Sequence, residues 1–376
     1  MNREELKTLI TESLKHQGFR LNGNEILPPP RLTKSRLRRL HLPAVQHKVE
    51  KASDELRRGE QNLLRRIASG GEVSPEAIRP RLIEVRPDSD DELLFRYASL
   101  HWSIPVSSGY GRRLRFLVVD DHNEKLIGLI GLGDPVFSLS ARDAWIGWDT
   151  GLRQERLKHV MDAFVLGAVP PYSFLLCGKL VAMLAASNEV REVFKRKYGN
   201  RFSVIRNEKM DGRLALISTT SALGRSSIYN RLKFGERILY YRVGFTRGCG
   251  EFHFSDGLYG AISQYSARYC EPTAKMRRWG TGFRNRREVI RKCLIKVGLS
   301  ADWLYHGIQR EIFVVPLARN AGQFLRGEAS KLLWLDQPAA DLFSFFRDRW
   351  LLPRAGRDDE YRRFIPSSYR LWRSKQ

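Results

Sequence analysis

One long apolar block inside an otherwise strongly basic chain constrains the fold more than any other feature of this sequence. The block spans residues 108–184 and consists of short apolar runs separated by polar turns and glycines. Short apolar runs bounded by turn residues are typical of strands and short helices that share one core. The block therefore predicts a folded domain of mixed α and β structure.

The strand predictions come from apolar runs that end at polar or helix-breaking residues. The runs 114–119 and 125–132 are joined by a polar turn and predict a hairpin. The run 163–169 ends at a pair of prolines and predicts a buried strand. Further strands are predicted at 213–219 and 238–245. The fold class that these runs predict is α+β, with a central, mainly antiparallel mixed sheet flanked by basic helical regions.

Helices are predicted where apolar residues recur at helical spacing or follow a capping residue. They are expected over residues 6–14, 31–68, 92–102, 152–160, 179–186 and 188–198. Prolines at 28–30 and glycines at 70–71 interrupt the pattern. The predicted parts are an N-terminal basic helical region over 1–87, a central α+β domain over 88–270 and a basic C-terminal region over 271–376 that packs on the core.

The net charge points to a partner. The 376 residues carry a formal net charge of +24, and 42% of them are hydrophobic. That hydrophobic content suits a packed core and excludes a disordered tail, so the surplus charge lies on the surface of a folded body. Such a surface attracts polyanions through counterion release. Nucleic acid is the favoured partner, DNA before RNA; an inert basic surface and an acidic protein partner are the alternatives, and a homo-oligomer is compatible with either.

Cysteine usage and the apolar runs bear on compartment and cofactors. The four cysteines form no C-x-x-C pair, and no histidines stand at zinc-binding spacing from them. The first residues have no apolar stretch of signal-peptide type, and no apolar run reaches the roughly 18 residues needed to cross a bilayer. We therefore expect a cytoplasmic protein that is not bound to a membrane and that holds neither a metal ion nor another cofactor.

Several long, tryptophan-rich motifs resemble one known family. They are Tyr97-Ala-Ser-Leu-His-Trp102, Gly109-Tyr-Gly-Arg-Arg-Leu-Arg-Phe116, Gly131-Leu-Gly-Asp-Pro-Val136, Arg142-Asp-Ala-Trp-Ile-Gly-Trp148, Val169-Pro-Pro-Tyr172, Gly224-Arg-Ser-Ser-Ile-Tyr229 and Gly244-Phe-Thr-Arg-Gly-Cys-Gly250. Over residues 80–320 the chain resembles the family of the DruA component of Druantia anti-phage defence systems. The resemblance implies a role in bacterial antiviral defence beside other Druantia subunits, which include a large helicase-like protein. It identifies no catalytic residue.

The order of the predicted elements is also similar to the acetyltransferase-like (GNAT) fold. A hairpin and a buried strand precede a helix that begins at Gly178-Lys179. In that fold a glycine-rich loop before the helix presents backbone N–H groups to the pyrophosphate of coenzyme A. The corresponding segment, Leu175 to Leu180, keeps one glycine and lacks the leading Arg or Gln and the second glycine. This departure argues against acyl-CoA binding, although the sheet itself is expected to be GNAT-like.

The strongest local signal for a ligand is a basic segment near the start of the C-terminal region. Trp279 and Phe283 alternate there with arginines, and Glu288 is its one acidic residue. Arginine contacts phosphates, and aromatic rings stack on exposed bases. The predicted nucleic-acid-binding residues are Lys275, Arg277, Arg278, Trp279, Phe283, Arg284, Arg286, Arg287, Arg291 and Lys292. The alternative is a solvated loop whose two aromatic side chains pack under the body.

The candidates for catalysis are two aspartates. Asp143 and Asp149 stand with Trp145 and Trp148 in one compact cluster, and burial beside an indole raises the pKa of a carboxyl group. On a strand, Asp143 and Trp145 would share one face. Such a carboxyl group would act as an acid or base, or would join nearby aspartates in binding a metal ion. The alternative is a structural aspartate paired with arginine, with the tryptophans in the core.

Together these features predict a nucleic-acid-binding component of a multi-protein bacterial anti-phage defence system of the Druantia type. One alternative is a DNA-modifying or DNA-cleaving enzyme, either a degenerate acyltransferase or a metal-dependent nuclease. The other is a structural hub whose positive surface holds acidic partner subunits.

Overall fold

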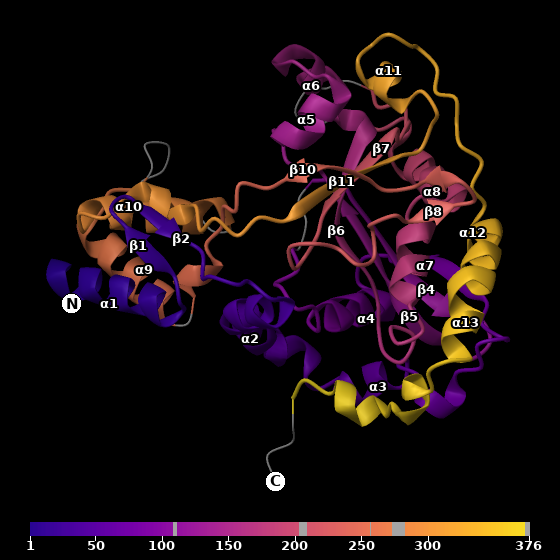
Figure 1. Ribbon diagram of the computed structural model, residues 1–376, viewed down its shortest axis with the longest axis horizontal. Coiled ribbons are helices and arrows are strands. Elements are labelled where there is room, and N and C mark those ends of the chain that lie inside the picture. The colour runs from indigo at the N-terminus through magenta and orange to yellow at the C-terminus, as the bar shows by residue number, and fades with distance from the viewer. Residues whose placement is uncertain (108–110, 203–208, 256, 273–282, 373–376) are drawn as a thin grey trace.

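A seven-stranded mixed sheet lies at the centre of the larger of two lobes (Figure 1). The computed structural model describes residues 1–107, 111–202, 209–255, 257–272 and 283–372, and of residues 283 and 284 it describes the backbone alone. In their order across the sheet, the strands are β10 (Tyr241–Phe245), β11 (Glu311–Pro316), β7 (Leu216–Thr220), β6 (Val160–Ala168), β5 (Lys125–Gly133), β4 (Arg113–Asp120) and β3 (Pro80–Glu84). β6 and β7 pair in parallel, and all other neighbours pair antiparallel. The predicted α+β class with a mainly antiparallel mixed sheet is confirmed.

β4 and β5 form the predicted hairpin, and their side chains enter two different cores. Phe116 and Val118 of β4 belong to one hydrophobic cluster, whereas Leu117 and Val119 belong to another. Alternate residues of a strand point to opposite faces, so a strand covered on both faces needs apolar residues throughout. This requirement explains why the apolar runs of the central block are nearly continuous.

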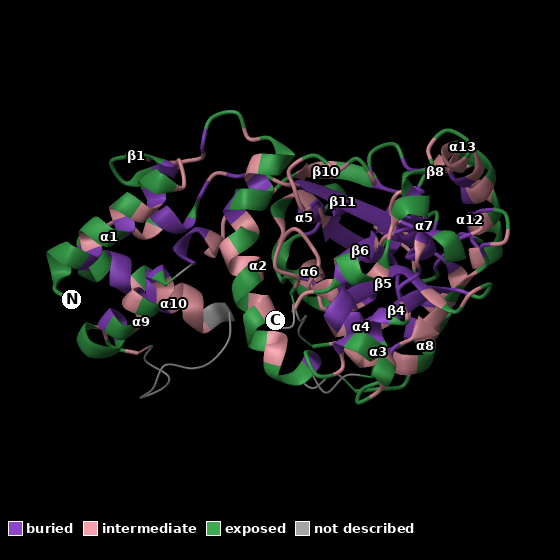
Figure 2. Ribbon diagram, turned by 90° about the horizontal axis from the view of Figure 1, so that it is seen from below, coloured by how far each residue is buried: buried purple, intermediate pink, exposed green. Residues whose placement is uncertain are grey.

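Helices cover both faces of this buried sheet (Figure 2). Those of the larger lobe are α3 (Glu60–Leu64), α4 (Asp90–Ser99), α5 (Ser140–Ile146), α6 (Thr150–Arg156), α7 (Cys177–Leu184), α8 (Asn188–Tyr198), α11 (Ala321–Leu325), α12 (Ala339–Phe346) and α13 (Leu352–Ala355). One face is packed by α7, α8 and α12 through Leu180, Phe194 and Phe346. The opposite face carries α4 near β4 and β5, and α5 near β10 and β11.

The smaller lobe is built from the beginning of the chain and from a segment of its second half. It contains α1 (Arg3–His16), β1 (Arg20–Asn22), β2 (Glu25–Leu27), α9 (Leu258–Tyr269) and α10 (Phe283–Lys296). Leu6, Ile10 and Leu14 of α1 pack with Ile262 of α9 and Leu294 of α10 in a separate hydrophobic cluster. The predicted boundaries at residues 87 and 270 stay a prediction, and this cluster unites residues from all three of the predicted parts.

Between the lobes lies α2 (Lys34–Leu56), which together with α3 confirms the helical prediction for this stretch. The side chain of Thr33 begins α2 by accepting a hydrogen bond from the N–H of Arg36. A small hairpin of β8 (Lys233–Phe234) and β9 (Arg237–Ile238) precedes the edge strand β10.

The lobes are connected where three chain segments cross at very close range. A Cβ atom on Gly248 would lie 2.6 Å from the carbonyl carbon of Gly307, and one on Gly307 would lie 2.9 Å from Cδ of Pro28. Both glycines also have a φ of +71°, which residues with a side chain rarely adopt. Beside them, Cys249 and Tyr305 form an isolated antiparallel bridge. This crossing, called the joint below, therefore requires glycine at positions 248 and 307.

Candidate nucleic-acid interface

The described end of the predicted basic segment lies in α10, beside the joint. Outside the described residues lie Lys275, Arg277, Arg278 and Trp279, together with the side chains of Phe283 and Arg284. Arg286 Nε lies 3.7 Å from a carboxylate oxygen of Glu251, and its Nη2 donates to the carbonyl oxygen of Phe254 at 3.3 Å. The guanidinium also lies 4.0 Å from the ring centre of Tyr259. These contacts hold Arg286 within the smaller lobe.

The other described members of the segment differ in their partners. Arg291 pairs with Glu288 at 3.2 Å, and Lys292 Nζ donates to the carbonyl oxygen of Glu271 at 2.6 Å. Arg287 is half-buried, and its charge opposes the burial that raises the pKa of Glu251. Arg287 thus acts at the joint together with Arg286, since the charges of both arginines oppose the rise in the pKa of Glu251.

A second source of positive charge is the first half of α2. No Asp or Glu occurs between Glu25 and Glu50. The basic residues of this stretch are Arg31, Lys34, Arg36, Arg38, Arg39 and Lys48. Arg38 and Arg39 are exposed, and Arg38 Nε donates to the hydroxyl of Ser103 at 3.3 Å. Because this stretch contains no acidic residue of its own, this half of the helix carries a net positive charge.

A third source is the chain that runs from β7 to the joint. Its basic residues are Arg225, Arg231, Lys233, Arg237, Arg242 and Arg247, with Glu236 as the only acidic residue between positions 221 and 249. Arg225 and Arg247 are exposed. Arg242 of β10 is half-exposed and lies 3.5 Å from the buried carboxylate of Glu311. That carboxylate also accepts the N–H of Ser226 at 2.7 Å, so Glu311 positions both Arg242 and the turn that carries Arg225.

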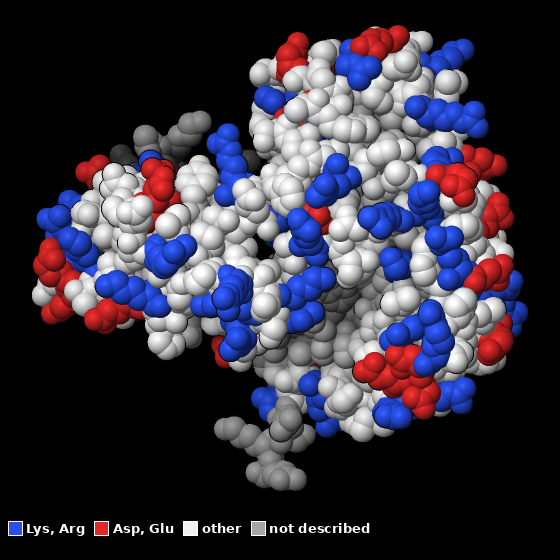
Figure 3. All heavy atoms as spheres, in the orientation of Figure 1, with Lys and Arg blue, Asp and Glu red and all other residues white. Residues whose placement is uncertain are grey.

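Close contacts bring these three sources together around the joint. The Cβ position of Gly224 lies 3.8 Å from a methyl group of Leu37 in α2, and the ring of His41 in α2 lies 4.1 Å from that of Phe252. The exposed or half-exposed arginines gathered there are called the basic joint face: Arg38, Arg39, Arg225, Arg242, Arg247 and Arg287. Figure 3 shows Lys and Arg side chains around a hollow between the lobes, over α2 and toward β10, while most Asp and Glu side chains lie toward the outer margins.

The joint contains one carboxyl group whose charge depends on pH near neutrality. Burial raises the pKa of Glu251 to about 7, against the opposing charges of Arg286 and Arg287. The three histidines packed around Phe252 behave differently, because burial lowers the pKa of His41 and His253 to about 4 and that of His306 to about 2. These histidines are neutral near pH 7, and the charge of the joint comes from its arginines and Glu251.

DNA binding is therefore expected to strengthen a few-fold as the pH falls from about 8 to about 6. Over this range Glu251 takes up a proton, and the basic joint face loses a nearby negative charge. The measurement compares the DNA affinity of the wild type and of Glu251→Gln at several pH values and constant ionic strength. The glutamine variant should bind like the low-pH wild type throughout, and a variant that keeps the pH dependence of the wild type would contradict the role of Glu251.

The pH dependence of the free energy of unfolding provides an independent test of the raised pKa of Glu251. Because the folded-state pKa of Glu251 is raised above 4.5, its bound proton stabilises the fold fully below about pH 4.5, and this contribution is lost as the pH rises through about 7. Glu251→Gln should therefore gain stability relative to the wild type as the pH rises from about 5 to about 8.

Asp143 lies in a helix, because residues 140–146 form α5, so the arrangement considered for a strand does not apply. Asp143 is buried and accepts two hydrogen bonds from Arg142, at 2.8 and 2.6 Å, and one from Arg153 at 3.1 Å. Its second oxygen also accepts the N–H of Leu139 at 3.1 Å, which holds the first turn of α5. These contacts are those of the arginine-paired structural aspartate that the sequence left as the alternative.

The second catalytic candidate has a helix-capping geometry. Asp149 is exposed and accepts the N–H of Leu152 at 2.7 Å at the beginning of α6. Trp148 is buried and donates from Nε1 to the carbonyl oxygen of Leu325 at 2.7 Å, whereas Trp145 is exposed. A catalytic role for either aspartate stays a prediction, and among the described residues no group of three His, Cys, Asp or Glu side chains is placed to hold a metal ion.

The beginning of α7, where coenzyme A would bind in an acetyltransferase, is covered by protein. A Cβ atom on Gly178 would lie 3.2 Å from Ile228, and Lys179 Nζ donates to the carbonyl oxygens of Ser227 and Ile228. The same ammonium group lies 5.5 Å from the ring centre of Trp350. These contacts pack other parts of the protein against the first turn of α7.

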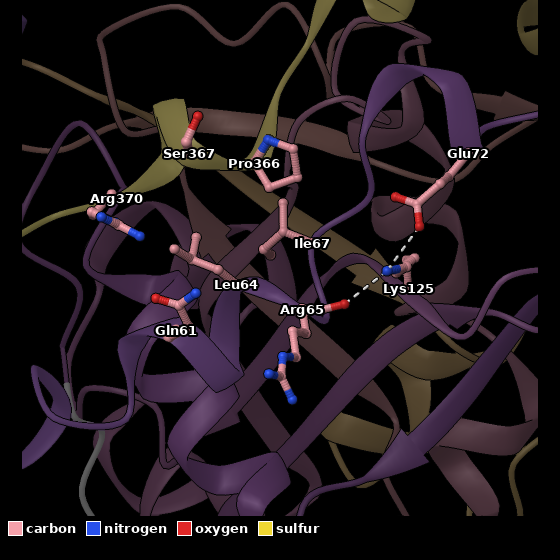
Figure 4. A pocket seen from close by; sticks show the side chains of 9 residues that line it. All are labelled: Gln61, Leu64, Arg65, Ile67, Glu72, Lys125, Pro366, Ser367 and Arg370. Carbon is pink, nitrogen blue, oxygen red and sulfur yellow. Dashed lines mark hydrogen bonds and ion pairs between the residues drawn. The ribbon is translucent and has the colours of Figure 1, made fainter.

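A pocket of about 280 Å³ is lined by residues that do not belong to the basic joint face (Figure 4). It is lined by Gln61, Leu64, Arg65, Ile67, Glu72, Lys125, Pro366, Ser367 and Arg370. Lys125 Nζ is already engaged there, since it donates to the carbonyl oxygen of Arg65 at 2.8 Å and pairs with Glu72 at 3.0 Å. In the part of the chain that the structure describes, no helix is long and apolar enough to span a membrane.

The predicted nucleic-acid-binding residues do not include Arg39, Arg225, Arg242 or Arg247. The signal for them was the scarcity of acidic residues at 26–49 and 221–249, two stretches far apart in the chain. Only the fold shows that these stretches meet at the joint.

The fold and this surface define a basic α+β protein whose two lobes meet at an arginine-rich joint. Residues 31–327 match the family described as Druantia protein DruA. The chain is also 40% identical to the Druantia protein DruA of Escherichia coli (strain UMEA 4076-1) over 372 residues, which are 98% of this chain and 90% of the relative. The chain belongs to the DruA family, as its motifs predicted. No solved structure matches it, and the GNAT-like character of the sheet stays a prediction.

Proposed function

We propose that this protein is a nucleic-acid-binding component of a multi-protein Druantia anti-phage defence system and that it holds DNA on the basic joint face. The observation that carries the proposal is the meeting of three arginine-rich stretches around one hollow. Membership of the DruA family supports the setting in defence, with other Druantia subunits, including a helicase-like protein, as partners in the cytoplasm.

The chemistry of the face suits phosphates. Arginine donates two parallel hydrogen bonds to phosphate oxygens, and each phosphate it neutralises releases a condensed counterion. Arg39, Arg225 and Arg247 are exposed, so they reach a ligand without first breaking a buried contact. A helical arm and an edge strand on two sides of a hollow would hold a nucleic acid from both sides.

Affinity for DNA across a salt series tests the proposal, and the basic segment before α10 provides a first variant. Replacing Arg277, Arg278, Arg284 and Arg287 with alanine, while keeping the structurally engaged Arg286, should lower the affinity about tenfold or more and reduce the salt slope by up to about 3. To detect cleavage, the DNA is also incubated with the wild-type protein and Mg²⁺ or Mn²⁺, and the length of its strands is then measured. An unchanged slope in the folded variant would remove this segment from the interface, and absence of salt-dependent binding by the wild type would overturn the proposed function.

A further inference from the structure

The edge strand of the sheet carries exposed aromatic side chains that contacts to phosphates do not explain. Trp145 and Tyr241 are each 37% exposed, and Phe245 is 42% exposed. Tyr241 and Phe245 lie on β10, which ends the sheet and pairs only with β11 among the described strands. Exposed apolar groups on an unpaired edge promote aggregation unless they serve a partner.

Two of these rings, those of Trp145 in α5 and Tyr241 in β10, are neighbours. The ring centres of Trp145 and Tyr241 are 6.3 Å apart. Phe137, in the turn before α5, is 47% exposed. Tyr241 lies opposite Val314 on the face that α5 covers, whereas Phe245 lies opposite Glu311 on the other face. The four rings, called the aromatic edge, thus follow the border of the sheet on both sides of β10.

Arginines accompany the rings. The guanidinium of Arg153 lies 4.7 Å from the ring centre of Phe137, and that of Arg242 lies 5.7 Å from that of Phe245. Arg242 also belongs to the basic joint face, so the aromatic edge and the phosphate-binding surface share a border. A partner that covers both must be anionic and must present flat apolar groups close to its charges.

We propose that the aromatic edge stacks on unpaired bases of a single-stranded nucleic acid whose phosphates lie on the basic joint face. The inference rests on the proposed function and specifies the form of the ligand. Unpaired bases expose their faces to aromatic rings and to arginine, whereas the bases of a duplex are stacked on one another. Stacking on rings reads no particular sequence, which suits binding to the varied strands of an invading genome.

A pair of leucine substitutions tests the proposal. Trp145→Leu combined with Tyr241→Leu keeps apolar bulk against α5 and removes both rings. The matched control is Trp334→Leu, because Trp334 is also 37% exposed. Its ring centre lies 4.5 Å from the guanidinium of Arg191, so it is an exposed ring beside a positive charge, as Phe137 and Phe245 are. Affinities are measured for a single-stranded oligonucleotide, for a duplex of equal length and for a strand with abasic positions. A 2-aminopurine base in the single strand reports stacking by its loss of fluorescence.

The double variant is expected to bind the single strand at least about tenfold more weakly than the wild type. It is also expected to lose the fluorescence change of the 2-aminopurine base. Its affinities for the duplex and the abasic strand, and all affinities of the Trp334→Leu control, should stay within about twofold of wild type. Phenylalanine at both positions should restore binding. An equal loss on all three ligands, or no loss on any while the wild type binds DNA, would overturn the inference and leave the proposed function standing. A wild type that binds no nucleic acid would overturn both.

Discussion

Replacing Arg39, Arg225 and Arg247 with glutamine is expected to reduce the salt slope of DNA binding by about 2 to 3 and the affinity roughly 100-fold near physiological salt. Each of these side chains is exposed, and together they come from α2, from the turn after β7 and from the segment after β10. Each phosphate contact contributes about 0.9 to the slope for duplex DNA and about 0.7 for a single strand, so three contacts contribute about 2 to 3. The counterion contribution to binding vanishes near 1 M salt. A salt slope that is lower by about 2 to 3 therefore corresponds to an affinity that is roughly 100-fold lower near physiological salt. Titrations at four or more salt concentrations measure both quantities.

The control removes the same charge elsewhere. Lys15, Lys296 and Lys331 are exposed and lie in α1, at the end of α10 and in the loop after α11. Their replacement by glutamine should change the slope by less than about 1, since general attraction falls but no contact is lost. If both triple variants lose affinity equally, the protein attracts DNA through its overall charge and the basic joint face has no special role.

Asp143→Ala is expected to lower the free energy of unfolding by about 3 to 5 kcal/mol. The side chain of Arg142 is fully buried and pairs with Asp143, and Arg153 pairs with the second oxygen of the same carboxylate. Without Asp143, a buried guanidinium would keep its charge and lose its counter-ion, and the first turn of α5 would lose the contact with Leu139. Urea denaturation followed by circular dichroism measures the difference.

Asp149→Ala is the control, because it removes a nearby aspartate that has no buried arginine partner among the described residues. It separates the effect of leaving Arg142 unpaired from the effect of losing any aspartate in this region. Asp149 is exposed and caps α6, and removal of a cap costs about 1 kcal/mol. If Asp143→Ala were as stable as Asp149→Ala, the buried arginine would not depend on Asp143, and a catalytic explanation for this carboxylate would return.

How far the sequence predicts the fold depends on whether the deciding contacts are local. The hairpin of β4 and β5 and the capped helix α8 are predictable, because apolar runs, a polar turn and the Ser187 cap are all short-range signals. α5 is not predictable in this way. Its single acidic residue sits in the interior only because two arginines neutralise it, and one of them, Arg153, comes from the next helix.

The candidate interface shows the same limit. The basic segment is visible in sequence, yet the contacts that engage Arg286, Arg291 and Lys292 become visible only in the folded chain. Conversely, Arg39 and Arg225 stand far apart in sequence, and the packing of Leu37 against Gly224 brings their segments together. The aromatic edge likewise needs Trp145 of α5 and Tyr241 of β10 to become neighbours.

The way the smaller lobe is assembled also sets an order of events during synthesis. α1 is translated long before α9 and α10, which supply the partners of its apolar stripe. Leu6, Ile10 and Leu14 therefore stay exposed until these later helices have been made. β11 emerges later still, although its place is between β7 and β10. Of the described strands, the last to be translated is thus an inner one, and the sheet closes only after the segment between β10 and β11 has been synthesised. The nascent chain therefore carries an unsatisfied helix and an open sheet for most of its translation, a condition that calls for protection by a chaperone or by rapid completion.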